Sequence, residues 1–235
     1  MITKAHLLFE QSGTFKNEFI KHNISAIDYD ISNKFNQTDY VIDLFSQIHK
    51  AFNTKDRTIF DQISPSDIVI AFFPCTKFDE QIKLWFRGDA YSMKDWSEIE
   101  KLTYDLLLHN QLHENYVTLT ELALIAYNRN LKLIIENPYS RSGYLSTYWC
   151  HNPAIIHKDR RVYGDYYKKP TQFFFFNAEP KDNDIPLPKD NGVGVYQPMV
   201  NMSSSFYQNG ATNKFLARSM IAPDYAKYFI EQYIL

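Results

Sequence analysis

The stretch Ile68 to Cys75 reads IVIAFFPC, an unbroken apolar run that ends at a proline and then presents a cysteine. A short continuous run rich in Ile, Val and Phe is typical of a strand buried on both faces. Because proline cannot extend a central strand, we expect the chain to leave the sheet at Pro74. A cysteine just past the carboxyl end of a parallel strand lies where open α/β sheets bind their ligands.

Other segments of the chain alternate between strand-like and helix-like patterns. Besides 67–73, we expect strands at 5–9, 25–29, 40–44 and 131–135. Helical spacing of apolar residues predicts helices at 15–22, 96–128 and 224–235. The second is one helix or two, capped by Asp95 or Ser97. Its apolar stripe comprises Ile99, Leu102, Leu106, Leu112, Tyr116, Leu119 and Leu122. Strands separated by helices predict an α/β fold with a doubly wound, mostly parallel sheet.

The sequence changes character after Pro170. KKPTQFFFFN predicts one more strand, whose consecutive phenylalanines suggest burial on both faces. Residues 177–213 are rich in Pro, Gly, Asn and Ser and favour a long loop or a small insertion. We therefore expect residues 1–176 and 214–235 to form one domain, with 177–213 as a loop-rich insertion.

Composition narrows the classes of partner and compartment. The 235 residues carry a net charge of −2 and a pI of about 6.4, so a nucleic-acid partner would need a local basic patch. Two cysteines, Cys75 and Cys150, make neither a disulfide framework nor a cysteine-only zinc site, and a reducing cytoplasm fits best. The first residues lack the pattern of a signal peptide, and no apolar run reaches membrane-spanning length. We expect a cytoplasmic protein without a metal or a membrane partner.

The stretch FEQSGTF at 9–15 is a candidate ligand-binding turn. A strand, a small-residue turn and a helix make a cradle for a phosphate or nucleoside, because the helix N-terminus offers free N–H groups. The same pattern also suits a simple strand-to-helix connection. Asp28 and Asp30 end the next predicted strand, and Asp43 ends the one after it. Acids there can accept hydrogen bonds from ribose hydroxyls or can merely cap helices.

A second candidate site combines Cys75 with the stretch LIIENPYS at 133–140. Cys75 is either a small buried residue beside Pro74 or a nucleophile. Another predicted strand ends at Glu136-Asn137-Pro138, again with a proline that we expect to turn the chain out of the sheet. A thiolate can add to an electron-poor ring carbon while a glutamic acid gives a proton to the neighbouring ring nitrogen. The coincidence of the two strand ends favours chemistry on a heterocyclic base.

The order of these motifs resembles C5-cytosine DNA methyltransferases, especially the short phage-type members, over nearly the whole chain. The similar segments are FEQSGTF, FFPCTKF, IIENPYS, VYGDYYKKPTQFFFFN and ARSMIAPDYAKYFIEQYI, in that order. The resemblance implies a Rossmann-like methyltransferase fold that uses S-adenosylmethionine. It also implies that Cys75 attacks C6 of a cytosine, that Glu136 holds and protonates N3, and that Asn137 shapes the loop. The target base would have to leave its stack.

The resemblance also assigns binding residues. Asp30 would hold the ribose of the cofactor and Asp43 would contact its adenine end. The other residues expected at the cofactor are Phe9, Ser12, Gly13, Thr14 and Ser219. The candidates for contact with double-stranded DNA are Lys77, Arg160, Arg161, Lys168 and Lys169. A solvated charged face is an alternative interpretation of these basic residues.

The chain departs from the family pattern in ways that keep alternatives open. Glu10 and Gln11 stand where the first cofactor motif has a small residue and a glycine, so that motif is degenerate. Residues 177–213 are short for a target-recognition domain, and a protein partner would then supply recognition. One alternative is a non-catalytic binding protein of methyltransferase fold, for example in phage–host conflict. Another is the same thiolate chemistry on a free pyrimidine nucleotide or on RNA.

Overall fold

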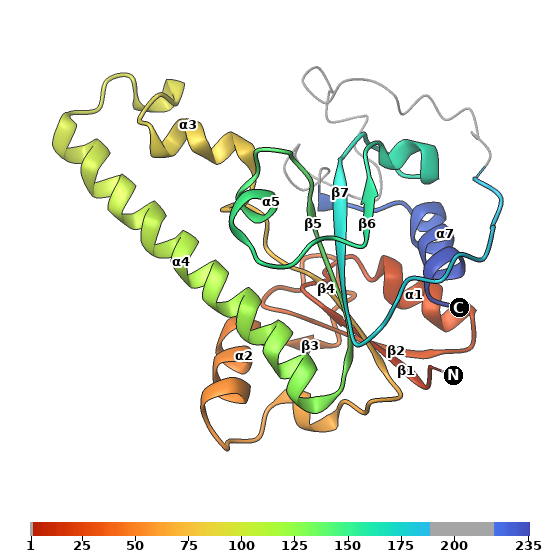
Figure 1. Cartoon of the computed structure of the whole chain (residues 1–235). Coiled ribbons are helices and arrows are strands. Elements are labelled where there is room, and N and C mark those ends of the chain that lie inside the picture. The colour runs from red at the N-terminus through yellow and green to blue at the C-terminus, as the bar shows by residue number, and fades with distance from the viewer. Residues whose placement is uncertain (1, 189–218) are drawn as a thin grey trace.

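The computed structural model describes residues 2–188 and 219–235, which form a seven-stranded sheet with helices on both faces (Figure 1). The strands are β1 (Lys4–Leu8), β2 (Ser25–Asp30), β3 (Tyr40–Val41), β4 (Ile68–Phe72), β5 (Lys132–Pro138), β6 (Ile155–His157) and β7 (Thr171–Phe176). The helices are α1 (Thr14–Lys21), α2 (Leu44–Asn53), α3 (Lys83–Phe86), α4 (Glu98–Arg129), α5 (Tyr144–Tyr148) and α7 (Pro223–Tyr233).

The sheet has the strand order β3-β2-β1-β4-β5-β7-β6. The first five strands in this order pair in parallel, and β7 is antiparallel to both of its neighbours. The order reverses between β1 and β4, which is the switch point at which doubly wound sheets bind ligands. The predicted α/β fold with a doubly wound, mostly parallel sheet is confirmed.

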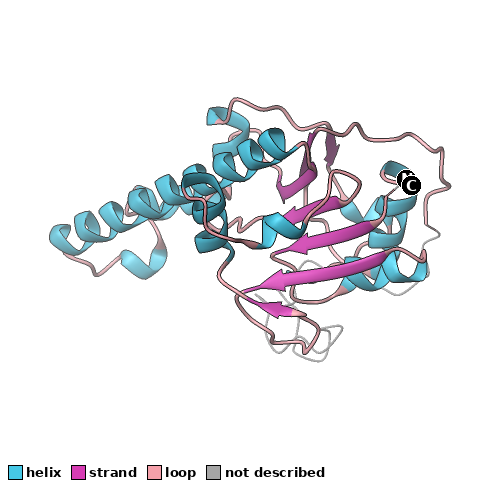
Figure 2. Ribbon diagram, turned by 90° about the horizontal axis from the view of Figure 1, so that it is seen from below, coloured by secondary structure: helices cyan, strands magenta, loops and turns pink. Residues whose placement is uncertain are grey.

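Two apolar layers hold the helices on the sheet. Alternate residues of β4 point to opposite faces, so Ile68 and Ile70 pack in the layer under α1 and α7. Val69 and Ala71 pack in the layer under α2 and α4. Burial on both faces explains why β4 reads as an unbroken apolar run. Figure 2 shows helices on both sides of the strands.

Several predicted boundaries were wrong. The strand expected at 40–44 ends at Val41, because Asp43 is the N-cap of α2 and accepts hydrogen bonds from the amides of Phe45 and Ser46. The helix expected at 96–128 is a single helix, and Ser97, one of its two predicted caps, forms a capping box with Glu100. β6 was not predicted, since it has three residues.

Pro138 does not turn the chain out of the sheet as predicted. β5 continues through Pro138, which pairs with Thr171 of the antiparallel strand β7. A proline is tolerated there because it is the last residue of the strand, at the rim of the sheet. KKPTQFFFFN does form a strand buried on both faces, as predicted.

Helix α4 extends well beyond the sheet and carries α3 near its far end (Figures 1 and 2). We call this projecting part, residues 83–111, the α3–α4 arm. The apolar stripe of α4 is buried where it crosses the sheet, at Leu119 and Leu122, but Ile99 and Leu106 on the arm are more than half exposed. Within 2–188 and 219–235, no helix combines the length and apolar character needed to cross a membrane.

The predicted insertion at 177–213 is described only up to residue 188. Residues 177–188 contain no helix or strand, as predicted, and the rest of the insertion lies outside the described residues. The backbone amides of Lys181 and Asn183 donate to the carbonyls of Tyr233 and Gln232, so this segment runs along the end of α7.

Candidate functional site

Cys75 and Glu136 lie at the carboxyl ends of neighbouring parallel strands. Phe72, the last residue of β4, pairs with Glu136 of β5, and Cys75 follows three residues later. The side-chain amide of Asn137 donates to the carbonyl of Phe73 at 3.0 Å and fixes the turn that carries Cys75. The Glu136 carboxylate is close enough to Cys75 to raise the pKa of its thiol. The three residues predicted to be catalytic are therefore together.

The charged groups around Cys75 have opposite effects on the pKa of its thiol. Burial is the main reason that the pKa of the Cys75 thiol is raised. The Lys169 ammonium lowers this pKa, whereas Glu136 and Asp79 raise it. The thiol therefore needs help to become a nucleophilic thiolate, and Lys169 is the cation placed to give it.

Arg160 was predicted to contact nucleic acid, and this prediction was wrong. Its side chain is fully buried, so it cannot reach a phosphate backbone. Its Nε lies 2.5 Å from Asp165 Oδ2, and its Nη1 lies 3.5 Å from Glu136 Oε1. The guanidinium also lies 4.4 Å from the centre of the Tyr225 ring. Burial opposes the charge, but Asp165, Tyr225 and Glu136 outweigh it and raise the pKa of Arg160.

Several polar atoms in this place have no hydrogen-bond partner among the described residues. They are Glu136 Oε1, Asn137 Oδ1, and Nη1 and Nη2 of Arg160, and all are buried. A buried polar atom without a partner is unfavourable, and its presence in a native structure calls for an explanation. A polar ligand that bound beside Cys75 would supply one. We call Cys75, Glu136, Asn137 and Arg160 the strand-end cluster.

The first turn, residues 9–13, has an unusual backbone. Phe9 has a φ of 63° and Gly13 a φ of 66°. At Gly13 a Cβ would lie 3.1 Å from atoms of Gln37, so glycine fits both the conformation and the space. A phenylalanine in the left-handed region is uncommon, and such residues occur where surrounding contacts hold them.

The N-terminus of α1 is not free, contrary to the sequence-based expectation. The carboxylate of Glu10 accepts the amide of Phe15 at 2.7 Å and the amide of Lys16 at 3.2 Å. Glu10 is buried, and burial raises its pKa to about 7 against the effect of these hydrogen bonds. An acid is favourable near a helix N-terminus because its charge complements the helix dipole.

The residues expected to contact S-adenosylmethionine would suit only one half of that molecule. Asp30 is buried at the end of β2, where its carboxylate accepts the amide of Ser32 and the side chain of Gln11. Burial raises the pKa of Asp30. The rings of Phe9, Phe45 and Phe73 pack together where Phe9 begins the first turn. An acid and an aromatic wall suit a ribose and an adenine, whereas Glu10 occupies the amides that would suit the cofactor's carboxylate.

The other cofactor candidates divide into two groups. Ser12 and Thr14 bond to each other, and the Thr14 hydroxyl lies 3.4 Å from the carbonyl of Ile221, so the C-terminal segment reaches the first turn. Asp43 is exposed and caps α2 with its carboxylate, and Ser219 is exposed. These two side chains are not part of the first turn.

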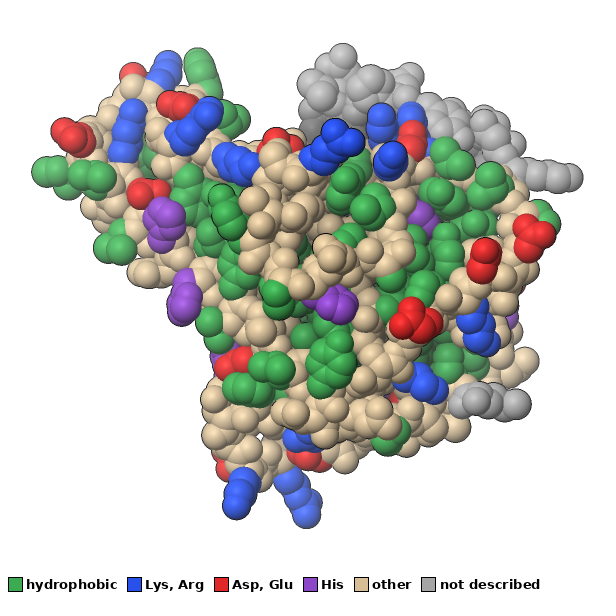
Figure 3. Space-filling model, viewed as in Figure 1, with side chains coloured by type: hydrophobic (Ala, Val, Ile, Leu, Met, Phe, Trp, Pro, Cys, Tyr) green, Lys and Arg blue, Asp and Glu red, His purple; other side chains and the backbone are tan. Residues whose placement is uncertain are grey.

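The remaining basic candidates lie outside the cluster's buried interior. Lys168 is exposed, and Lys77 and Lys169 are half-buried. Arg161, next to the buried Arg160, pairs instead with Asp159 at 2.6 Å. Figure 3 shows Lys and Arg side chains gathered along the upper edge of the molecule, next to the α3–α4 arm.

Glu80 ties together the loops on either side of the strand-end cluster. Its carboxylate accepts the hydroxyl of Ser140 at 2.5 Å and that of Ser142, while Lys83 donates to the carbonyl of Ser142. The amide of Tyr144 also donates to the carbonyl of Phe78. The loop after Cys75 is therefore fastened to the loop after β5. Nothing in the sequence predicts this link, because Glu80 and the two serines lie about sixty residues apart.

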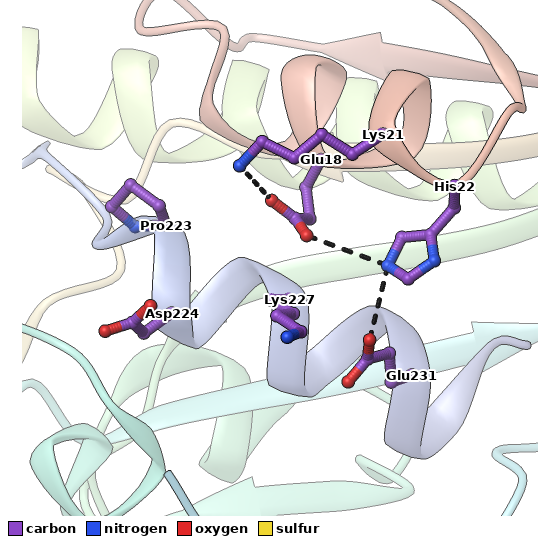
Figure 4. A pocket seen from close by; sticks show the side chains of 7 residues that line it. All are labelled: Glu18, Lys21, His22, Pro223, Asp224, Lys227 and Glu231. Atoms are coloured by element: carbon purple, nitrogen blue, oxygen red, sulfur yellow. Dashed lines mark hydrogen bonds and ion pairs between the residues drawn. The ribbon is translucent and has the colours of Figure 1, made fainter. Parts of the chain in front are cut away.

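A surface cleft of about 320 Å³ opens elsewhere, between α1 and α7 (Figure 4). The residues that line it are Glu18, Lys21, His22, Pro223, Asp224, Lys227 and Glu231. None of the predicted site residues lines this cleft. In the part of the chain that the structure describes, no three His, Cys, Asp or Glu side chains are grouped to hold a metal.

Comparison of the chain with models of protein families and with curated proteins finds no match.

Proposed function

We propose that the protein is an S-adenosylmethionine-dependent methyltransferase that acts on C5 of cytosine in DNA. The observation that carries the proposal is the strand-end cluster. A cysteine, a carboxyl group and a buried arginine meet there, with buried polar atoms that have no hydrogen-bond partner among residues 2–188 and 219–235. These groups match the needs of a pyrimidine ring, which presents an electrophilic carbon next to ring nitrogen and carbonyl groups.

The chemistry assigns one task to each side chain. The Cys75 sulfur forms a bond to C6, and the electrons of the C5–C6 double bond move to C5 while Glu136 holds and protonates N3. The bound cofactor supplies the methyl group that C5 accepts. Loss of the C5 proton and departure of the sulfur from C6 then restore the ring. Arg160 keeps the Glu136 carboxyl in place through its ion pair.

The substrate base must leave its stack to reach this site. Cys75 is half-buried and Glu136 is buried, so neither can contact a base inside a duplex. Lys77 follows Cys75 closely in the sequence, and the Lys169 ammonium lies near enough to lower the pKa of its thiol; together with Lys168 they would hold the flanking phosphates. The charge of −2 argues that the DNA contact is local and strongly salt-dependent.

Transfer of a labelled methyl group tests the proposal. The protein is incubated with methyl-labelled S-adenosylmethionine and with duplex DNA, single-stranded RNA or dCMP. Label in the cytosine of duplex DNA, abolished by Cys75→Ser, is the expected result. Label in RNA or dCMP alone would keep the thiolate chemistry and change the substrate. Equal transfer by the Cys75→Ser variant would show that the mechanism is wrong.

A non-catalytic binding protein is the second candidate function. The observation that favours it is Glu10, whose carboxylate fills the helix N-terminus at the first turn. Calorimetry separates the two candidates, because a non-catalytic relative would bind neither S-adenosylmethionine nor S-adenosylhomocysteine. DNA binding in a gel-shift assay, without cofactor binding or methyl transfer, would support the second candidate.

A further inference from the structure

The first turn carries its own negative charge where a ligand's negative group would otherwise bind. The two amides that a carboxylate or phosphate would take, those of Phe15 and Lys16, both donate to Glu10. Glu10 is 5% exposed, so its carboxylate is enclosed by protein. An anionic group of a ligand at this turn would find these two N–H groups of α1 already bonded and the negative charge of Glu10 behind them.

The charges around Glu10 strengthen this effect. Lys16 from α1 and Asp28 from β2 are the charged groups that act on Glu10. The Lys16 ammonium is already held by Asp28 at 3.0 Å and by Asp39 at 3.2 Å, and it donates to the carbonyl of Gln37. One lysine therefore faces three carboxylates. The turn is electronegative and suits a neutral or cationic group.

The backbone of the turn is arranged to place Glu10 there. Phe9 adopts a φ of 63°, and its ring packs edge-on against Phe45 and Phe73. The residue that follows it then turns inward to α1, and Gln11 bonds to Asp30. Since a phenylalanine in this region is strained, the aromatic contacts must hold the conformation. The placement of Glu10 is thus built into the fold.

We propose that Glu10 determines ligand specificity at the first turn, which selects nucleosides with a cationic or neutral tail and rejects those whose tail carries a carboxylate or phosphate. This inference rests on the proposed function, because it concerns the same cofactor pocket. The amine and sulfonium of S-adenosylmethionine suit the turn, and its carboxylate does not. In this proposal Asp30 still binds the sugar, and the rings of Phe9, Phe45 and Phe73 still contact the base.

Calorimetry with two probes tests the proposal. S-adenosylhomocysteine and its decarboxylated form, S-adenosyl-3-thiopropylamine, differ only in the carboxylate. At pH 8 the wild type binds the amine roughly tenfold more tightly than S-adenosylhomocysteine, because the amine lacks the carboxylate that the charge of Glu10 repels. Glu10→Gln, which keeps the shape and removes the charge, gains roughly tenfold for S-adenosylhomocysteine and nothing for the amine.

The pH dependence provides a second readout. Burial raises the pKa of Glu10 to about 7, so its charge is mostly present at pH 8 and mostly absent at pH 6. Wild-type affinity for S-adenosylhomocysteine therefore rises as the pH falls from 8 to 6, while that of Glu10→Gln stays constant. Asp28 also faces this place and has a raised pKa, and the Gln variant separates its contribution from that of Glu10.

Glu18→Gln is the matched control. Glu18 is another buried glutamate, on α1 itself, but it faces the cleft between α1 and α7 and pairs with Lys21 (Figure 4). Glu18→Gln also removes one buried glutamate charge without touching the first turn, and it leaves the preference for the amine unchanged. Wild-type protein that binds S-adenosylhomocysteine as tightly as the amine would overturn the inference and leave cofactor use intact. If neither the wild type nor any variant bound either probe, both this inference and the proposed use of S-adenosylmethionine would be overturned.

Discussion

The protonation state of the Cys75 thiol depends on its neighbours. Burial keeps its pKa above that of a free thiol, Lys169 acts in the opposite direction, and Glu136 adds to the increase. A thiol in this state is protonated at neutral pH and reacts slowly until a ligand or a nearby cation stabilises the thiolate. For Cys75 to act as the proposed nucleophile, Lys169 must stabilise the thiolate against the opposing charge of Glu136.

The reaction rate of Cys75 with iodoacetamide measures this balance. Glu136→Gln removes a negative charge and lowers the pKa of Cys75, so alkylation at pH 7.5 becomes faster. Lys169→Met removes a positive charge, raises that pKa and slows alkylation. The rates are followed by peptide mass spectrometry, which separates Cys75 from the exposed Cys150. Identical pH profiles for all three proteins would mean that the three side chains do not share a site.

Arg160 and Arg161 make a matched pair for stability. Arg160→Met leaves Asp165 and Glu136 buried without their cation, and we expect a loss of roughly 3–5 kcal/mol in the free energy of unfolding. Arg161→Met breaks the partly exposed pair with Asp159, and we expect a loss of at most about 1 kcal/mol. Urea denaturation measures both values. Equal losses would contradict the different burial of the two arginines.

At the scale of elements, the ends of β4 and β5 form the site because the two strands are adjacent and parallel. Their apolar residues specify burial, and their first polar residues then emerge at the same edge of the sheet. The loops beyond these ends are held together by Glu80 and its two serines. Hydrogen bonds from Ser140 and Ser142 lower the pKa of Glu80, so the link persists at neutral pH.

Removal of this link should loosen the loop that carries Cys75. We expect Glu80→Ala to increase the rate of backbone amide hydrogen exchange in residues 76–83 and 139–144, because the two loops lose their common acceptor. Exchange in the strands β4 and β5 should not change. Glu98→Ala, which alters another exposed glutamate at a helix start, is the control. Unchanged exchange in both loops would show that Glu80 does not fasten them.

The sequence was sufficient to predict elements whose burial is uniform. β4, β5 and β7 are largely buried, so their apolar runs identified them, and Cys75 after β4 and Glu136 near the end of β5 followed as strand-end residues. The prediction at Pro138 was wrong because proline is excluded from the middle of a central strand but is tolerated as the last residue of a strand. Ile99 and Leu106 misled because a periodic stripe predicts a helix but not how far the helix extends beyond its sheet.

The roles of Glu10 and Arg160 could not be predicted for a different reason. Each depends on contacts between segments that are distant in the sequence or on one unusual backbone angle. Arg160 meets Glu136 only because the segment between β6 and β7 packs against β5, far away in the sequence. Two adjacent arginines give no sign of which one is buried. Glu10 faces α1 because Phe9 adopts a positive φ, which no propensity predicts for phenylalanine.

On the scale of the whole molecule, the two candidate sites lie at different strands of one sheet. The strand-end cluster lies at β4 and β5, and the first turn lies at β1, on the other side of the switch point in strand order. The C-terminal segment joins them, since Asp165 beside Arg160 accepts the amide of Ala222 and Thr14 reaches the carbonyl of Ile221. A base at one place and a nucleoside at the other would meet across the edge of the sheet.

Covalent trapping tests this account most directly. The protein is incubated with S-adenosylmethionine and with random-sequence duplex DNA in which 5-fluorocytosine replaces cytosine, since fluorine at C5 prevents release of the sulfur. We predict a stable protein–DNA adduct by intact mass, located at Cys75, dependent on the cofactor and absent from Cys75→Ser. No adduct in the wild type, or an equal adduct in Cys75→Ser, would contradict the assignment of Cys75 as the nucleophile.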